Sequence, residues 1–103
     1  PHLGCITDIE NKPLENVIVR VFDSAYNKLV NSTVTNHKGQ YAVLVGPSTY
    51  YATYEKSGYE QTKTDIINLS SENTNGMGGI IDVNEKLEKE KYESKTDQIE
   101  SSN

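Results

Sequence analysis

The sequence has little of several features that mark particular classes of protein. It contains one cysteine, Cys5, so no disulfide can form within the chain. It has no tryptophan, and none of its apolar runs approaches the roughly 20 residues that a membrane-spanning helix requires. Its 103 residues leave no room for a large enzyme fold such as an α/β barrel. We therefore expect one small domain without disulfides and without insertion in a membrane.

Positive charge is also scarce. Ten lysines and arginines stand against fifteen aspartates and glutamates, and the resulting net charge of −5 argues against a nucleic-acid partner and favours solubility. The chain starts at Pro1 without a basic segment followed by an apolar one, so no targeting signal is visible. We expect the sequence to be an excerpt from a longer protein.

What the sequence does contain is a series of short β-strand patterns. Residues 17–22, 41–45 and 50–55 alternate with a period of two and are rich in β-branched or aromatic side chains. Residues 30–34 show a weaker version, and 3–7 and 80–83 supply a first and a last strand. No stretch of a dozen residues before the charged C-terminal region has helical periodicity.

Turn-forming residues separate these strands at short intervals. Asn11 and Gly39 stand where a positive φ is expected. Other turns are expected at 23–27, 46–48 and 57–58, and a longer polar loop at 69–79. This spacing predicts an all-β antiparallel sandwich of six or seven strands. The expected core consists of Ile6, Val17, Val19, Val21, Tyr41, Val43, Tyr50 and Tyr54.

The composition changes at Glu85. Residues 85–103 contain six acidic and four basic side chains, and their large apolar residues, Leu87, Tyr92 and Ile99, do not repeat at helical spacing. We therefore divide the chain into a sandwich domain at 1–84 and a charged flexible tail or linker at 85–103. The tail is expected to be disordered or weakly helical.

Four groups of residues resemble one known family. Their order and spacing over residues 3–83 are similar to those of carboxypeptidase regulatory-like domains. The resemblance implies a seven-stranded, prealbumin-like (transthyretin-like) Greek-key sandwich, in which Asn11 and Asn16 replace glycines. Because the matched residues form turns or point inward, the resemblance implies a fold and no catalytic residue. The groups are Gly4-x-Ile6-x-Asp8 with Pro13-Leu14-x-Asn16-Val17-x-Val19, Thr35-Asn36-x-x-Gly39-x-Tyr41-x-Val43, Pro47-Ser48-x-Tyr50, and Gly58-Tyr59.

The residue types that most often carry chemistry are few and scattered. His2 and His37 are far apart and have no cysteine or glutamate at ligand spacing, so we expect no metal site. Cys5 has no local base to activate it and is interpreted as a strand residue. Asp8 and its neighbours are interpreted as turn caps rather than calcium ligands. Residues 75–79 lack the lysine and the helix of a phosphate-binding loop. We expect neither catalytic residues nor a cofactor.

The seven tyrosines raise the clearest functional question. Tyr41, Tyr50 and Tyr54 are expected to point into the core. Tyr51 alternates with inward residues, and Tyr59 follows a break in the strand pattern. These two are our candidates for contact with a ligand or a partner, because exposed aromatic rings stack on sugars or anchor protein interfaces.

These observations favour a non-catalytic module over an enzyme. We expect a monomeric spacer or interaction domain in a larger bacterial cell-surface or membrane-associated protein, outside the cytoplasm. Its partners would be neighbouring domains or other proteins. One alternative is a carbohydrate-binding module that uses outward tyrosines on glycans. Another is binding of a small ligand in a channel between two copies, as in transthyretin, which requires self-association.

Overall fold

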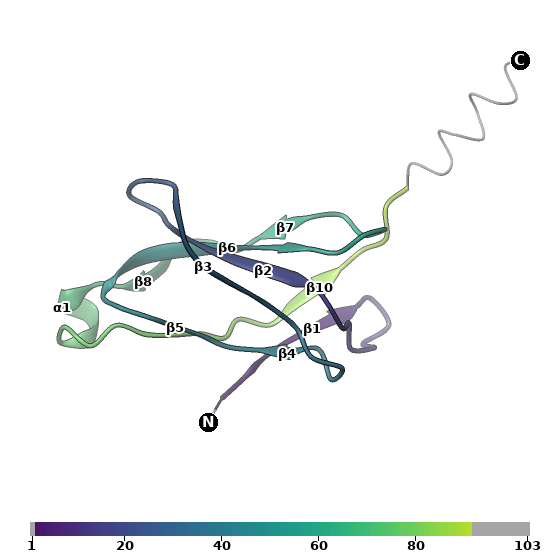
Figure 1. Cartoon of the computed structure of the whole chain (residues 1–103), viewed down its shortest axis with the longest axis horizontal. Helices are drawn as coiled ribbons and strands as arrows, with labels where there is room; N and C mark the ends of the chain where they lie inside the picture. The colour runs from purple at the N-terminus through teal and green to yellow at the C-terminus, as the bar shows by residue number, and fades with distance from the viewer. Residues whose placement is uncertain (1, 92–103) are drawn as a thin grey trace, which may run out of the picture.

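Two layers of β-strands face each other in the computed structural model, which describes residues 2–91 (Figure 1). The first layer is one sheet whose neighbouring strands all run antiparallel. Its strands are β2 (Ile18–Asp23), β3 (Lys28–Val34), β6 (Ser48–Glu55), β7 (Thr62–Lys63) and β8 (Ile67–Leu69). Their order is β3-β2-β6-β7, and β8 extends the sheet by pairing with the other end of β6.

The second layer is divided into two patches. One joins β1 (Gly4–Asp8) to β4 (Gln40–Tyr41) and β10 (Glu85–Leu87), and the other joins β5 (Val43–Val45) to β9 (Gly79–Ile81). Only Ala42 separates β4 from β5, and only residues 82–84 separate β9 from β10. If each of these pairs, and β7 with β8, counts as one interrupted strand, the ten segments form the seven strands of the expected sandwich. The chain crosses between layers before β6 returns beside β2, as in a Greek key.

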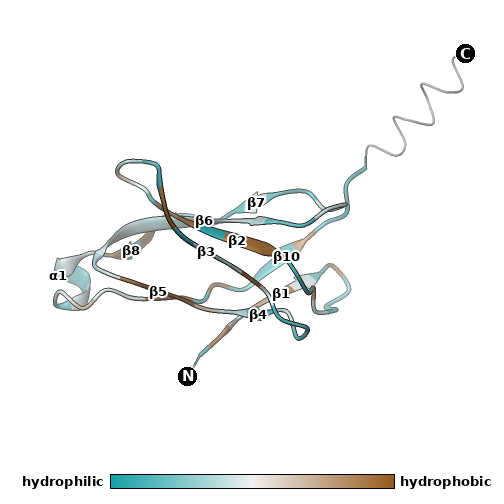
Figure 2. Cartoon of the chain, in the orientation of Figure 1, coloured by the Kyte–Doolittle hydropathy of each residue, from teal (hydrophilic) through white to brown (hydrophobic). Residues whose placement is uncertain are grey.

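The core lies between the layers and contains the residues that the alternation predicted. Every expected core residue is at most 5% exposed, and Leu14, Ala52, Ile81 and Leu87 join them. Figure 2 shows hydrophobic residues gathered in β2 and β5, whereas the turn between β3 and β4 is hydrophilic. Removal of this apolar surface from water is the main contribution that favours the folded state.

The turns form where the sequence predicts them. Asn11 (φ 68°), Asn16 (φ 65°) and Gly39 (φ 74°) adopt the left-handed conformation. Gly39 also lies so close to β1 that a Cβ atom there would stand 2.5 Å from the carbonyl oxygen of Ile6. Asn36 Oδ1 accepts two hydrogen bonds from backbone N–H groups of the same turn, each 2.9 Å long. This is the turn-stabilising role expected of an Asn at this position.

The structure corrects the expected start of the charged tail. The sequence predicted a flexible linker from Glu85, but β10 pairs with β1, and Leu87 is 0% exposed. The backbone of residues 88–90 then forms hydrogen bonds of 2.8 and 2.9 Å with that of residues 58–60. The prediction was wrong because a three-residue strand is too short to repeat a pattern, and Leu87 is its only fully buried side chain. The rest of the predicted tail, residues 92–103, lies outside the described residues.

Smaller differences lie between residues 60 and 79. β7 and β8 were not predicted, and the expected polar loop at 69–79 contains the short helix α1 (Ser71–Thr74). Asn75, at φ 54°, ends this helix in the left-handed conformation. Within residues 2–91, no helix has the length and apolar character needed to cross a membrane.

Candidate functional site

Tyr51, the first candidate contact residue, lies on the outer face of the first layer and is half-buried. Phe22, on β2, is the residue paired with Tyr51, and the two rings stack with centroids 5.1 Å apart and an angle of 12° between their planes. The ammonium of Lys63 lies 5.1 Å from the centre of the Tyr51 ring, a cation–π distance. The hydroxyl donates a 3.1 Å hydrogen bond to Asn27 Oδ1. Neighbouring side chains therefore already use much of the ring surface that a sugar would need.

A shallow pocket of 330 Å³ lies beside Tyr51. Its lining is about equally polar and apolar and comes from β6, β7, the β2–β3 turn and the segment between β7 and β8. Lys63 and Asp65 give it one cation and one carboxylate, and Ile66, 60% exposed, gives it an apolar side. This composition could accept a polar, uncharged group, but no lining side chain is both charged and deeply buried.

Tyr59, the second candidate, closes one end of the sandwich. It follows Gly58, whose φ of 87° turns the chain after β6, and it packs against the core while remaining half-buried. Its backbone forms an isolated bridge with Lys89. It lines a pocket of 190 Å³ together with Asp8, Ile9, Glu10, Leu87 and Lys89. This pocket shares no lining residue with the pocket beside Tyr51, so the two tyrosines belong to separate surfaces.

Asp8 lies on the wall of the Tyr59 pocket, where it shapes the β1–β2 turn. Its Oδ1 accepts hydrogen bonds from the backbone N–H of Lys12 at 2.9 Å and of Glu10 at 2.8 Å. The bond from the Lys12 N–H is the main reason that the pKa of this carboxyl is lowered. Asp8 is therefore the turn cap that the sequence predicted.

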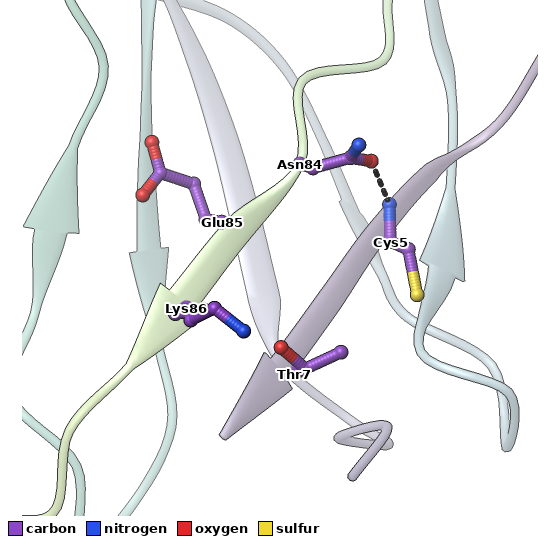
Figure 3. A pocket seen from close by; sticks show the side chains of 5 residues that line it. All are labelled: Cys5, Thr7, Asn84, Glu85 and Lys86. Carbon is purple, nitrogen blue, oxygen red and sulfur yellow. Dashed lines mark hydrogen bonds between the residues drawn. The ribbon is translucent and has the colours of Figure 1, made fainter. Parts of the chain in front are cut away.

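A third pocket, 360 Å³, lies over the seam between β1 and β10. Figure 3 shows Lys86, on β10, and Asn84, just before it, directed toward β1, where Cys5 and Thr7 lie. Asn84 Oδ1 accepts a 2.9 Å hydrogen bond from the backbone N–H of Cys5. The ammonium of Lys86 donates to Asn11 Oδ1 in the β1–β2 turn. Side chains thus reinforce the pairing of the two strands.

Glu85 lies between the two layers at the same edge. It is half-buried, and Figure 3 shows its carboxylate directed away from β1. Burial raises the pKa of this carboxyl, and the nearby charge of Asp65 raises it further. Glu85 and Asp65 come from opposite layers and line a common pocket. Lys63 lines the same pocket, so this edge of the sandwich brings two carboxylates and one ammonium together.

Two buried phenols tie the layers together. The hydroxyls of Tyr41, on β4, and Tyr54, on β6, lie 2.7 Å apart, and Tyr41 also donates a 2.8 Å bond to the carbonyl of Val83. The two rings meet edge to face, with centroids 5.8 Å apart. Burial raises the pKa of Tyr41 to about 12. The pKa of Tyr54 is also raised, mainly by burial and to a smaller extent by the hydrogen bond with Tyr41. Both phenols are thus protonated at neutral pH, and their role is structural.

The remaining candidate groups do not assemble into a reactive centre. His2 Nδ1 lies 2.7 Å from Asp82 Oδ2 at the start of β1, whereas His37 is exposed in the β3–β4 turn. Cys5 is half-buried on β1, with its sulfur 3.8 Å from the carbonyl oxygen of Lys38. Over residues 2–91, no group of three or more histidine, cysteine, aspartate or glutamate side chains is placed to hold a metal ion.

A comparison with protein families found a match. The sequence profile of the carboxypeptidase regulatory-like domain matches residues 3–78. The chain belongs to this family. No individual curated protein is similar enough to the chain to count as a match.

The match to the carboxypeptidase regulatory-like domain confirms the resemblance that the sequence motifs indicated. The family is a regulatory-like domain rather than a catalytic one, and its members share a prealbumin-like β-sandwich. The matched range contains β1 through α1 and stops before β9 and β10. The strands that close the second layer of this regulatory-like domain therefore lie outside the matched range. The contact roles of Tyr51 and Tyr59 stay predictions.

Proposed function

We propose that this regulatory-like domain is a non-catalytic spacer or interaction module of a larger protein. The observation that carries the proposal is the parallel pairing of β1 with β10, in the register Ile6↔Glu85, Thr7↔Lys86 and Asp8↔Leu87. Because the two strands run in the same direction, the chain arrives at one end of the pair and leaves at the other (Figure 1). Modules with this geometry extend a chain when they are joined in series.

The chemistry of the surface supports the same proposal. His2, Cys5 and Asp8 form their hydrogen bonds at separate places, and within residues 2–91 no three or more histidine, cysteine, aspartate or glutamate side chains are placed to hold a metal ion. A net charge of −5 favours solubility over attraction to polyanions. We place the parent protein at a bacterial cell surface or membrane, outside the cytoplasm, with adjoining domains or other proteins as partners.

Small-angle X-ray scattering on tandem proteins tests the spacer geometry. One protein contains a single copy of residues 1–103, and the other contains two copies joined head to tail. An in-line spacer predicts that the maximum dimension comes close to doubling in the tandem protein. Two copies that fold back side by side, with little increase in maximum dimension, would contradict it. Light scattering on the single copy tests the expected monomer, and a stable dimer would favour a ligand channel between copies.

Carbohydrate binding through Tyr51 or Tyr59 is the alternative proposal. The pocket beside Tyr51 supports it, because this pocket combines an aromatic ring with polar lining groups. The contacts of Phe22 and Lys63 with the same ring count against it. Oligosaccharide titrations followed by NMR chemical shifts separate the two proposals. Shifts centred on either tyrosine, lost in its alanine variant and kept in Tyr26→Ala, would favour carbohydrate binding.

A further inference from the structure

The direction of the strand pairs at the two ends of the domain has a mechanical consequence. Tension along the chain pulls β1 backward along its own axis and pulls β10 forward along an axis that runs in the same direction. The bonds between the strands are then loaded together, in shear. If β1 and β10 were antiparallel, both chain ends would leave from one end of the pair, and the bonds would open one after another.

We propose that this domain resists tension applied along its chain, with the β1–β10 seam as the element that must shear before the domain unfolds. This inference rests on the proposed role as a module within a longer chain. It goes beyond that role, because a spacer need only set a distance, whereas this seam would also keep the distance under force.

Side-chain bonds strengthen the seam along its whole length. At its start, His2 Nδ1 lies 2.7 Å from Asp82 Oδ2. Next along β1, the backbone N–H of Cys5 donates a 2.9 Å hydrogen bond to Asn84 Oδ1. Near its end, Lys86 is tied to the β1–β2 turn by its hydrogen bond to Asn11, described above. Shearing the strands past each other breaks these bonds together with the backbone pairs.

Further contacts hold both strands of the seam, on the far side of β1 and just after the end of β10. β1 pairs with β4. The backbone N–H of Ile6 donates a 2.8 Å hydrogen bond to the carbonyl of Gly39, and the carbonyl of Ile6 accepts a 2.9 Å hydrogen bond from the N–H of Leu14. After β10, residues 88–90 bond to residues 58–60 of the first layer. Ile6 and Leu87, both 0% exposed, anchor the two strands in the core. A pull on either chain end therefore reaches the seam through fixed neighbours.

Single-molecule force spectroscopy on the full chain tests this inference by changing only the direction of pulling. In a Cys5→Ser background, handles are attached to Leu3→Cys and Lys91→Cys, which load the seam in shear. In the matched protein, handles are attached to Leu3→Cys and Val83→Cys, whose positions lie at the same end of the seam, and Val83→Cys leaves every side-chain bond of the seam in place. Chemical denaturation of both proteins verifies that their equilibrium stabilities agree.

The expected result is an unfolding force several-fold higher with handles at 3 and 91 than with handles at 3 and 83. Forced unfolding reports the barrier along the pulled direction rather than the equilibrium stability, so the two geometries can differ in one fold. Equal forces in the two geometries would overturn the inference. The tandem scattering result is independent of this outcome, so a weak seam and a failed spacer geometry are distinguishable.

A second set of variants locates the resistance. Asn84→Ala removes the side-chain bond to Cys5, and Asn84→Asp keeps an oxygen that accepts it. Glu55→Ala breaks the ion pair with Arg20 on the first layer, away from the seam. We expect Asn84→Ala alone to lower the force measured between positions 3 and 91. A force unchanged by Asn84→Ala, or lowered as much by Glu55→Ala, would show that the resistance lies elsewhere.

Discussion

The strands within each layer of the sandwich are held together in a different way. In the first layer, β2 pairs along its full length with β3 on one side and with β6 on the other. In the second layer, β4, β5, β9 and β10 have two or three residues each, and the sheet is divided into two patches. Side-chain bonds from Tyr41 and Asn84 span the second layer where backbone pairing is short. Continuous pairing supports the first layer, and single residues support the second.

Tyr50→Ala tests the first layer and is expected to have the largest effect. The ring is 5% exposed, and its hydroxyl donates a 2.7 Å bond to the carbonyl of Gly46. Loss of a large core aromatic costs about 3–5 kcal/mol of unfolding free energy, enough to prevent folding of a small domain. Denaturant titration measures the change. Tyr26→Ala is the control, because Tyr26 is 80% exposed. Equal stability of the two variants would show that β6 is misplaced.

Leu87→Ala tests the second layer at the strand that the sequence predicted to be linker. The side chain is 0% exposed, so we expect a loss of about 2–5 kcal/mol in unfolding free energy. The neighbouring Lys86→Ala removes an exposed side chain from the same strand and should cost less. Thermal melts of both variants provide the measurement. A melting temperature unaffected by Leu87→Ala would restore the linker interpretation.

Alkaline pH is expected to weaken the bridge between the layers. Burial raises the pKa of Tyr41 to about 12 from the ordinary value of 10.0. Because the folded-state pKa is raised, the contribution of this phenol to stability is complete below pH 10.0 and is lost as the pH rises through about 12. Denaturant titrations across this range should show falling stability. Stability that stays constant up to the pKa of the folded state would contradict the buried phenol pair.

Tyr41→Phe is the mildest change. It keeps the ring and removes the hydroxyl that bonds Tyr54 and the carbonyl of Val83. Leaving these buried groups without a partner costs about 1–3 kcal/mol of unfolding free energy. Tyr51→Phe removes a hydroxyl at the surface and provides the control. If the free energy of unfolding falls equally in both variants, the buried bridge adds no more to stability than the surface hydroxyl of Tyr51.

The contrast between the layers also explains how much the sequence could predict. The alternation at 17–22 and 50–55 identified β2, β6 and half of the core, because long strands with one buried face repeat the same pattern many times. Asn11 and Gly39 identified turns, because few residues adopt a positive φ easily. These local signals were enough for the sandwich.

The rest depended on contacts between residues that are distant in the sequence. β7 and β10 are two and three residues long, so neither repeats a pattern, and Leu87 stands alone among charged neighbours. The register that brings Glu85 beside Ile6 is set by the whole fold, so the seam pocket and the role of Asn84 had no local signal. Tyr51 was correctly expected on an outer face, but its stack with Phe22 depends on the register between β2 and β6.

Hydrogen exchange of the β10 backbone amides tests the central claim most directly. Parallel pairing of β10 with β1 predicts that the amides of residues 85–87 that face β1 exchange slowly, with protection that Asn84→Ala reduces. The amides of β2 serve as the internal reference for a stable strand. Exchange at unprotected rates throughout 85–87, with β2 still protected, would contradict the seam and every conclusion drawn from its direction.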